Sequence, residues 1–185
     1  MSEPRAGRSA APPRADGGAG EVLGVALPPL VLDSTAGRVD LPELARDLLV
    51  LFIYPHATGL PEAPVPGWES IPGARGCTAQ ACSFRDHYDG LAALGATVAG
   101  LSVQTVAEQR QFAARVGLGY PLLSDSERQL GEALGLRTFS AGARTFYQRL
   151  TLVVSGGRIV NVVYPVREPE RNAEEVLAWL RGRSR

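Results

Sequence analysis

Hydrophobic residues gather in short runs along the chain, and helical patterns separate these runs. Residues 48–54 and 96–104 are mainly apolar, which is typical of strands buried on both faces of a sheet. Residues 148–166 contain two strand patterns around a Ser-Gly-Gly turn, and this arrangement predicts a β-hairpin. Shorter extended segments are expected at 25–35 and 120–125.

The helical patterns lie between and after the strands. The pattern at 105–117 has the clearest ends, because Thr105 and Glu108 form a capping-box sequence and Gly117 follows the last periodic residue. The other helices are expected at 41–48, 77–94, 126–135 and 169–182. Alternating strands and helices, followed by a hairpin and a closing helix, predict an α/β fold with a mixed central sheet flanked by helices.

The first 20 residues differ from the rest of the chain. They are rich in Ala, Gly, Pro and Arg and hold no large apolar residue after Met1, so they lack the hydrophobic centre of a secretory signal. We expect a disordered tail at 1–20, a single domain over 21–185, and a cytoplasmic location. No apolar run approaches the roughly 18–20 residues that a membrane-spanning helix needs.

Charge and cysteine content narrow the expected chemistry. The formal net charge is zero, which offers no electrostatic basis for binding nucleic acid or an anionic membrane, so neither is an expected partner. The two cysteines are too few for the disulfide framework of a small secreted protein. A close pair of cysteines instead indicates catalytic or metal chemistry.

Both cysteines lie in the segment "RGCTAQACSFRD", at the start of the helix expected at 77–94. With about 100° per residue, Cys77 heads the apolar stripe of that helix, and Cys82 lies about 140° away among polar residues. The residues expected to share the stripe with Cys77 are Ala81, Phe84, Tyr88 and Leu91. Unpaired amide groups at a helix N-terminus stabilise an anion, and the thiolate is the reactive form of cysteine. Cys77 is therefore placed to act as a nucleophile.

A disulfide between the two cysteines conflicts with an intact helix. Helical positions five apart have Cα atoms about 8.6 Å from each other, whereas a disulfide needs roughly 4.4–6.8 Å. A bond between Cys77 and Cys82 therefore requires the first turn of the helix to unwind. If the bond forms, the pair is a redox switch with a conformational step.

Two other interpretations remain open from the residues alone. A free cysteine often serves only as a small buried hydrophobic residue. A metal site would have to recruit His56 and His87, but their spacing from the cysteines matches no zinc pattern, so no metal is expected. His87 is expected at the surface of its helix.

The cysteine segment resembles a known family. "GCTAQACSFRD" is similar to the active-site segment of peroxiredoxins, specifically the peroxiredoxin Q or bacterioferritin comigratory protein group of the AhpC/TSA class. Four further segments resemble the family in the same order along the chain, and the resemblance extends over roughly 22–182. These segments are "LFIYP", "GLSVQ", "YPLLSD" and "QRLTLVV".

The resemblance implies a thioredoxin-like fold and a thiol-dependent peroxidase. Cys77 would attack a hydroperoxide and become a sulfenic acid, and Cys82 would condense with it to an intramolecular disulfide. Thioredoxin or a similar dithiol would reduce that disulfide, and Arg149 would hold the thiolate and polarise the peroxide. No cofactor is implied, and the group includes monomers and homodimers. The alternatives are a general thiol–disulfide oxidoreductase and a peroxide-sensing switch.

The sequence departs from the family in front of Cys77. The family has a threonine three residues before this cysteine, where its hydroxyl orients the peroxide, but Ala74 stands here. Thr58 matches that threonine if the loop at about 56–76 contains an insertion, and we predict that Thr58 still reaches the site. Trp68 and several prolines within the loop favour a packed lid or rim over the pocket.

Overall fold

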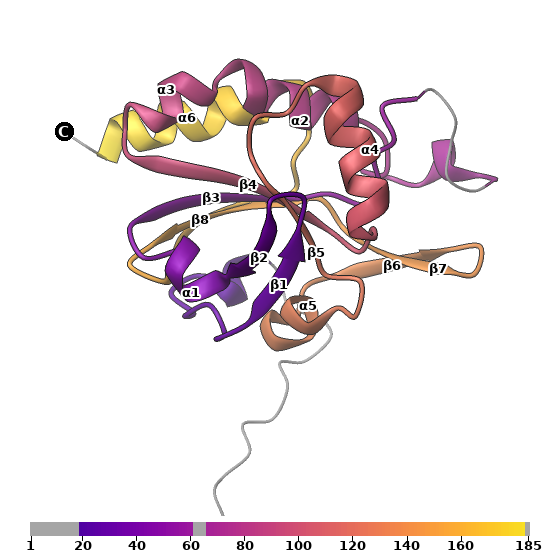
Figure 1. Ribbon diagram of the computed structural model, residues 1–185, viewed down its shortest axis with the longest axis horizontal. Helices are drawn as coiled ribbons and strands as arrows, with labels where there is room; N and C mark the ends of the chain where they lie inside the picture. The colour runs from indigo at the N-terminus through magenta and orange to yellow at the C-terminus, as the bar shows by residue number, and fades with distance from the viewer. Residues whose placement is uncertain (1–18, 61–65, 184–185) are drawn as a thin grey trace, which may run out of the picture.

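The computed structural model describes residues 19–60 and 66–183 (Figure 1). The predicted tail lies outside the described residues except for its last two, which begin a 3₁₀ helix, η1 (Ala19–Val22). Seven strands form one sheet in the order β2-β1-β5-β4-β3-β8-β9, and β6 pairs with β7 in a separate hairpin. The strands are β1 (Val31–Ser34), β2 (Gly37–Asp40), β3 (Leu48–Ile53), β4 (Ala96–Ser102), β5 (Leu122–Ser124), β6 (Thr138–Ala141), β7 (Arg144–Tyr147), β8 (Leu150–Ser155) and β9 (Arg158–Val163).

The sheet is mixed, as predicted. β3, β4 and β5 run parallel, whereas β8 lies antiparallel beside β3 and β1 lies antiparallel beside β5. The predicted hairpin is confirmed, because β8 and β9 pair across Gly156 and Gly157, which both have positive φ angles. Positive φ favours glycine, so the Ser-Gly-Gly signal located this turn correctly.

Helices cover both faces of the sheet (Figure 1). One face carries α2 (Cys77–Asp86), α3 (Tyr88–Ala92), α4 (Val106–Val116) and α6 (Asn172–Arg183), and the other carries α1 (Leu41–Leu44) and α5 (Gln129–Leu134). The predicted caps of α4 are confirmed, since Thr105 and Glu108 form a reciprocal capping box and Gly117 ends the helix in the left-handed conformation. The expected helices at 41–48 and 126–135 are shorter than predicted.

The strand β3 divides the core in two. Val50 and Phe52 pack toward α2 and α6, and the alternate residues Leu49 and Leu51 pack toward α1 and α5. All four are fully buried, as a strand covered on both faces requires. The Phe52 ring stacks on Phe84 of α2 with centroids 4.7 Å apart, so the helix that carries the cysteines is fixed directly to the central strand.

The helix expected at 77–94 is interrupted, which corrects the prediction. His87 leaves the helical conformation with φ −105° and ψ 8°, and α3 begins at the next residue. The backbone N–H of His87 donates to the Ser83 carbonyl, and its ring Nδ1 lies 2.9 Å from the same oxygen. Tyr88, the first residue of α3, is exposed rather than part of the buried stripe.

Three strands were not predicted, namely β2 and the two strands of the β6–β7 hairpin. The hairpin projects from the sheet in Figure 1, beside the loop that precedes α2. That loop was expected to lack regular structure, but it contains a 3₁₀ turn, η2 (Trp68–Ser70). The two features contact each other, because Trp68 packs on Phe139 and Phe146 of the hairpin.

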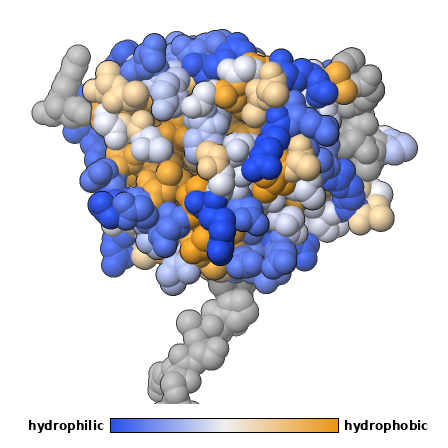
Figure 2. All heavy atoms as spheres, viewed as in Figure 1, coloured by the Kyte–Doolittle hydropathy of each residue, from blue (hydrophilic) through white to orange (hydrophobic). Residues whose placement is uncertain are grey.

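In Figure 2, hydrophilic residues lie mostly around the edges of the face that is drawn, and hydrophobic residues are visible between them in its middle. Among the described residues, the exposed large hydrophobic side chains are Leu23, Val25, Val31, Leu60 and Tyr88. Within the described part of the chain, none of the helices has the length and apolar character needed to cross a bilayer.

Candidate active site

Cys77 is the first residue of α2 and is nearly buried, with 5% of its surface exposed. The residue before it, Gly76, is left-handed with φ 90°. A Cβ atom on Gly76 would come within 2.7 Å of Pro169 Cγ, so both the backbone angle and the space require glycine there. The Cys77 thiol can donate to the Ala74 carbonyl at 3.5 Å. Glycine thus allows the chain to turn sharply and present the sulfur at the helix start.

Arg149 is the side chain that faces this sulfur. It lies just before β8, is only 3% exposed, and its Nη2 is 3.1 Å from Cys77 Sγ. A guanidinium suits an anionic partner, and the thiolate is the nucleophilic form of cysteine. The sequence-based expectation that Arg149 lies beside Cys77 therefore agrees with this geometry, although 72 residues separate the two along the chain.

Backbone and side-chain oxygens hold the guanidinium in place. The carbonyl oxygens of Gly73, Ala74 and Arg75 also lie 3.2, 3.4 and 2.7 Å from the guanidinium Nη2, so they share its two N–H groups with the sulfur. Its Nη1 donates to Gln80 Oε1 at 2.5 Å. These contacts are directional, so they fix the plane of the guanidinium as well as its position.

A buried polar relay continues behind Gln80. Gln80 Nε2 donates to Asn172 Oδ1 at 2.9 Å, and Thr151 Oγ1 donates to the same oxygen at 2.6 Å. All three side chains are fully buried. The relay links α2, α6 and β8 behind the cysteine. Sequence reasoning missed Gln80 and Asn172, although a polar residue on the buried side of a helix was a usable signal.

Cys82 lies in the middle of α2 and is partly exposed, and both thiols are free. The opposed environments of the two cysteines therefore match the prediction. Three contacts hold the helix between and after them: Tyr120 donates its hydroxyl to the Ala81 carbonyl at 2.7 Å, Phe84 stacks on Phe52, and Arg85 donates to the Val116 carbonyl at 2.6 Å. A disulfide requires part of this helix to unwind.

Thr58 lies in a different environment from Cys77 and Arg149. Its hydroxyl accepts from the Leu60 backbone N–H at 3.1 Å, and Arg115 of α4 donates to its carbonyl oxygen. The structure therefore brings Cys77 and Arg149 together but shows the Thr58 hydroxyl engaged with its own loop. The catalytic role of Thr58 stays a prediction.

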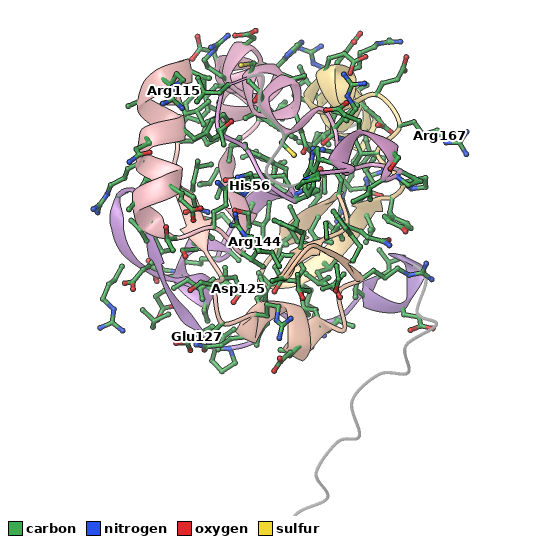
Figure 3. All side chains as sticks on the ribbon, turned by 90° about the vertical axis from the view of Figure 1, so that its right-hand side faces the viewer. His56, Arg115, Asp125, Glu127, Arg144 and Arg167 are labelled. Atoms are coloured by element: carbon green, nitrogen blue, oxygen red, sulfur yellow. The ribbon has the colours of Figure 1, made fainter. Side chains whose placement is uncertain are left out.

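His56 is buried in an aromatic cluster formed by Trp68, Phe146 and Phe139. Burial lowers the pKa of His56 to about 4, and the positive charge of Arg144 acts in the same direction. Figure 3 shows His56 and Arg144 near each other on this side of the molecule. Across the described residues no cluster of His, Cys, Asp and Glu could hold a metal ion, so His56 is not placed as a ligand.

A groove of about 860 Å³ opens on the other side of Arg149. One wall comes from the loop before α2, and the opposite wall comes from the segment that follows β9. Its lining includes Ile71, Pro72, Gly73, Arg149, Val166 and Pro169, together with the charged residues Glu69, Arg75, Arg167 and Glu170. The groove therefore combines apolar and charged lining residues with the guanidinium that contacts the sulfur.

Comparisons with known proteins bear on the family of this chain. A family model described as Redoxin matches residues 23–177. The chloroplastic peroxiredoxin Q of Arabidopsis thaliana is 31% identical over 161 residues, which are 86% of this chain and 67% of that protein.

Solved structures share the fold. Peroxidoxin BcpB of Mycobacterium tuberculosis is 27% identical with a TM-score of 0.70, covering 86% of this chain and 96% of that one. Peroxiredoxin Q of Xanthomonas campestris is 25% identical with a TM-score of 0.69, covering 88% and 99%. The expected thioredoxin-like fold is confirmed. This chain therefore belongs to the Redoxin family, in which it is a peroxiredoxin of the peroxiredoxin Q type and a thiol-dependent peroxidase.

Proposed function

We propose that Cys77 is the peroxidatic cysteine and Cys82 the resolving cysteine of this peroxidase. The Cys77 thiolate attacks the terminal oxygen of a hydroperoxide, an S–O bond forms, and the O–O bond breaks. The departing alkoxide or hydroxide takes up a proton and leaves as alcohol or water. Cys77 is then a sulfenic acid.

The second step regenerates the enzyme through a disulfide. The Cys82 thiol attacks the sulfenic sulfur, an S–S bond forms, and water leaves. Because α2 is intact in the reduced protein, its first turn must unwind for the two sulfurs to meet. An external dithiol then reduces the disulfide by exchange and is itself oxidised. We propose thioredoxin or a similar dithiol as that reductant.

Arg149 is proposed to act in the first step. Its guanidinium pairs with the thiolate and can donate to the peroxide as charge develops on the leaving oxygen. The observation that supports this assignment best is the distance of 3.1 Å between Arg149 Nη2 and Cys77 Sγ, in a site where both residues are nearly buried.

The groove beside Arg149 is the proposed path for the organic part of a hydroperoxide. Among its mixed lining, the apolar residues Ile71 and Pro72 of the loop before α2 and Val166 of the segment after β9 suit an alkyl or aryl group. Hydrogen peroxide needs no such contacts. We therefore propose that the enzyme reduces both hydrogen peroxide and organic hydroperoxides.

A coupled assay tests these assignments. The protein is mixed with cumene hydroperoxide, thioredoxin, thioredoxin reductase and NADPH, and the loss of NADPH is followed. We expect steady turnover that the substitution Cys77→Ser abolishes, and mass spectrometry of the oxidised protein should find a Cys77–Cys82 bond. Oxidation that stops after one equivalent would favour a peroxide sensor. Activity on protein disulfides but not on peroxides would favour a general oxidoreductase.

We also propose that Thr58 orients the peroxide, although its hydroxyl bonds to Leu60 in the reduced protein. The substitution Thr58→Val decides the point. A lower rate with hydrogen peroxide supports the predicted role in orienting the peroxide, and an unchanged rate rejects it. The oligomeric state, monomer or homodimer, and the cytoplasmic location also remain proposals from the sequence.

A further inference from the structure

The loop before α2 contributes three successive carbonyl oxygens to one guanidinium nitrogen. The carbonyl oxygens of Gly73, Ala74 and Arg75 lie 3.2, 3.4 and 2.7 Å from Arg149 Nη2 and share its two N–H groups with Cys77 Sγ. The position of the guanidinium over the sulfur therefore depends on the path of the backbone through 73–75. A shift of this backbone would move the donor that faces the reacting atom.

Trp68 fixes the other end of this path. It is only 5% exposed, and its ring centroid lies 4.9 Å from Phe146 and 5.6 Å from Phe139. The third aromatic neighbour is His56, whose ring is 6.5 Å away. The two phenylalanines belong to the β6–β7 hairpin, so the loop is anchored to a separate element of the fold. Buried aromatic side chains are strong anchors because they bury much surface at little cost in side-chain entropy.

The segment between the anchor and the carbonyls is short and internally bonded. Ser70 Oγ donates to the Gly67 carbonyl at 2.7 Å, the Ile71 N–H donates to Trp68, and the Ala74 N–H donates to Ile71. Ala74 is fully buried, so the end of the segment is packed as well. A displacement of Trp68 would therefore be transmitted to the carbonyl groups rather than absorbed by loose chain.

We propose that Trp68 is a positioning residue of the peroxidase: by anchoring 67–76 on the β6–β7 hairpin, it holds the carbonyl groups that fix Arg149 over Cys77. This proposal rests on the function proposed above for Cys77 and Arg149. Gln80 still binds Nη1 when the anchor is lost, so the guanidinium is loosened rather than released. Displacement of a group by a fraction of an ångström to 1 Å can lower a rate by up to about 100-fold, and we expect a decrease of about tenfold.

The test uses the variants Trp68→Ala and Trp68→Phe, with Trp179→Ala as a matched control on α6. Trp179 is half-buried beside Arg183 and has no part in the site. Two rates are measured for Cys77: its second-order rate with hydrogen peroxide, and its rate of alkylation by iodoacetamide at pH 7. We expect Trp68→Ala to lower both about tenfold, Trp68→Phe to restore most of the loss, and Trp179→Ala to have no effect.

A double-mutant cycle separates an effect of Trp68 that acts through Arg149 from a loss of activity that is independent of Arg149. Combined with Arg149→Lys, which cannot reproduce the forked contacts, Trp68→Ala should lower neither rate further. Equal losses in the two backgrounds, or no loss in the wild-type background, would overturn the proposal. If Trp68→Ala does not fold, Phe139→Ala replaces it with the same expectations. Phe139 is a partly buried member of the same aromatic cluster, so its removal also weakens the packing around Trp68.

The two readouts also distinguish the proposals from each other. Alkylation needs no peroxide turnover, so it reports the coupling of Trp68, Arg149 and Cys77 even if the chain fails as a peroxidase. Normal alkylation coupling with no peroxide turnover would reject the proposed function alone. Peroxide turnover in which Trp68→Ala behaves as wild type would reject the positioning role alone.

Discussion

Arg149 is almost completely buried, although removing a guanidinium from water is costly unless its donors find partners. Five oxygen and sulfur atoms lie within hydrogen-bond distance of its two terminal nitrogens, from the loop before α2 and from α2 itself. Among the described residues its buried Nε has no hydrogen-bond partner. A lysine could not reach all of them, because it carries a compact charge without the planar fork. The environment of Arg149 therefore selects arginine for its shape as well as its charge.

The substitution Arg149→Met should lower the second-order rate of Cys77 with hydrogen peroxide by about 100-fold, as for the loss of one donor that stabilises developing charge. The reason is that methionine fills similar volume but cannot donate to the peroxide or pair with the thiolate. Stopped-flow measurement of peroxide reduction under single-turnover conditions checks this. Arg158→Met, at an exposed position on β9, serves as control and should retain the wild-type rate. A rate within twofold of wild type for Arg149→Met would contradict the assigned role.

His56 makes the stability of the aromatic cluster depend on pH. Its folded pKa is about 4 because burial disfavours the charged ring, whereas an unfolded histidine has a value of 6.5. A depressed histidine pKa means that the unfolded state binds the proton first. The contribution of His56 to stability is therefore complete above pH 6.5 and is lost progressively as pH falls toward 4.

We accordingly expect the free energy of unfolding of the wild-type protein to fall more between pH 7 and pH 5 than that of the variant His56→Phe. Phenylalanine has no imidazole that could take up a proton. Urea denaturation at the two pH values measures the difference. Carboxylates titrate in both proteins, so the comparison isolates the histidine. Equal losses in the two proteins would show that His56 is not held neutral by its surroundings.

Among the elements, those with local signals were predicted well from the sequence. The ends of α4 were located correctly because its capping box and its terminal glycine act within a few residues. The buried strands β3 and β4 were recognised because burial on both faces leaves a continuous apolar run.

Elements that depend on distant contacts were missed. The β6–β7 hairpin is stabilised by Trp68, which lies about 70 residues earlier in the chain, so no local pattern marks it. The interruption of the helix at His87 was also missed, because the periodic pattern continues through it. The place of Cys77 at a helix start followed from the residue pattern, and that of Arg149 followed from resemblance. The carbonyl groups that hold Arg149 are backbone atoms, so the residue types do not indicate them.

The loop before α2 should also influence which peroxide is preferred. Ile71 and Pro72 form part of one wall of the groove, so replacing 60–72 by a short loop would widen it. We expect the rate for cumene hydroperoxide relative to hydrogen peroxide to fall by about tenfold, because the aryl group loses apolar contacts that hydrogen peroxide never makes. Steady-state kinetics with both peroxides give the ratio. The ratio cancels any effect common to both substrates, including a shift of Arg149, and an unchanged ratio would reject a role as wall of the pocket.

At the scale of the whole molecule, the polar relay joins three elements that the chain builds far apart. Gln80 of α2, Asn172 of α6 and Thr151 of β8 meet in the interior, where each hydrogen bond replaces contacts with water. Asn172 Oδ1 is the shared acceptor. The final helix is therefore connected through polar contacts to the helix that carries both cysteines, in addition to its apolar packing.

The substitution Asn172→Ala tests how much this connection contributes to the fold. It leaves Gln80 Nε2 and Thr151 Oγ1 buried without their acceptor, and each unpaired group costs about 1–3 kcal/mol. We expect the free energy of unfolding in urea to fall by about 2–4 kcal/mol. Asn161→Ala, at a half-buried position on β9, is the matched control and should cost less than about 1 kcal/mol, as is usual for substitutions away from such networks. A loss in Asn172→Ala no larger than in this control would mean that packing alone joins α6 to α2.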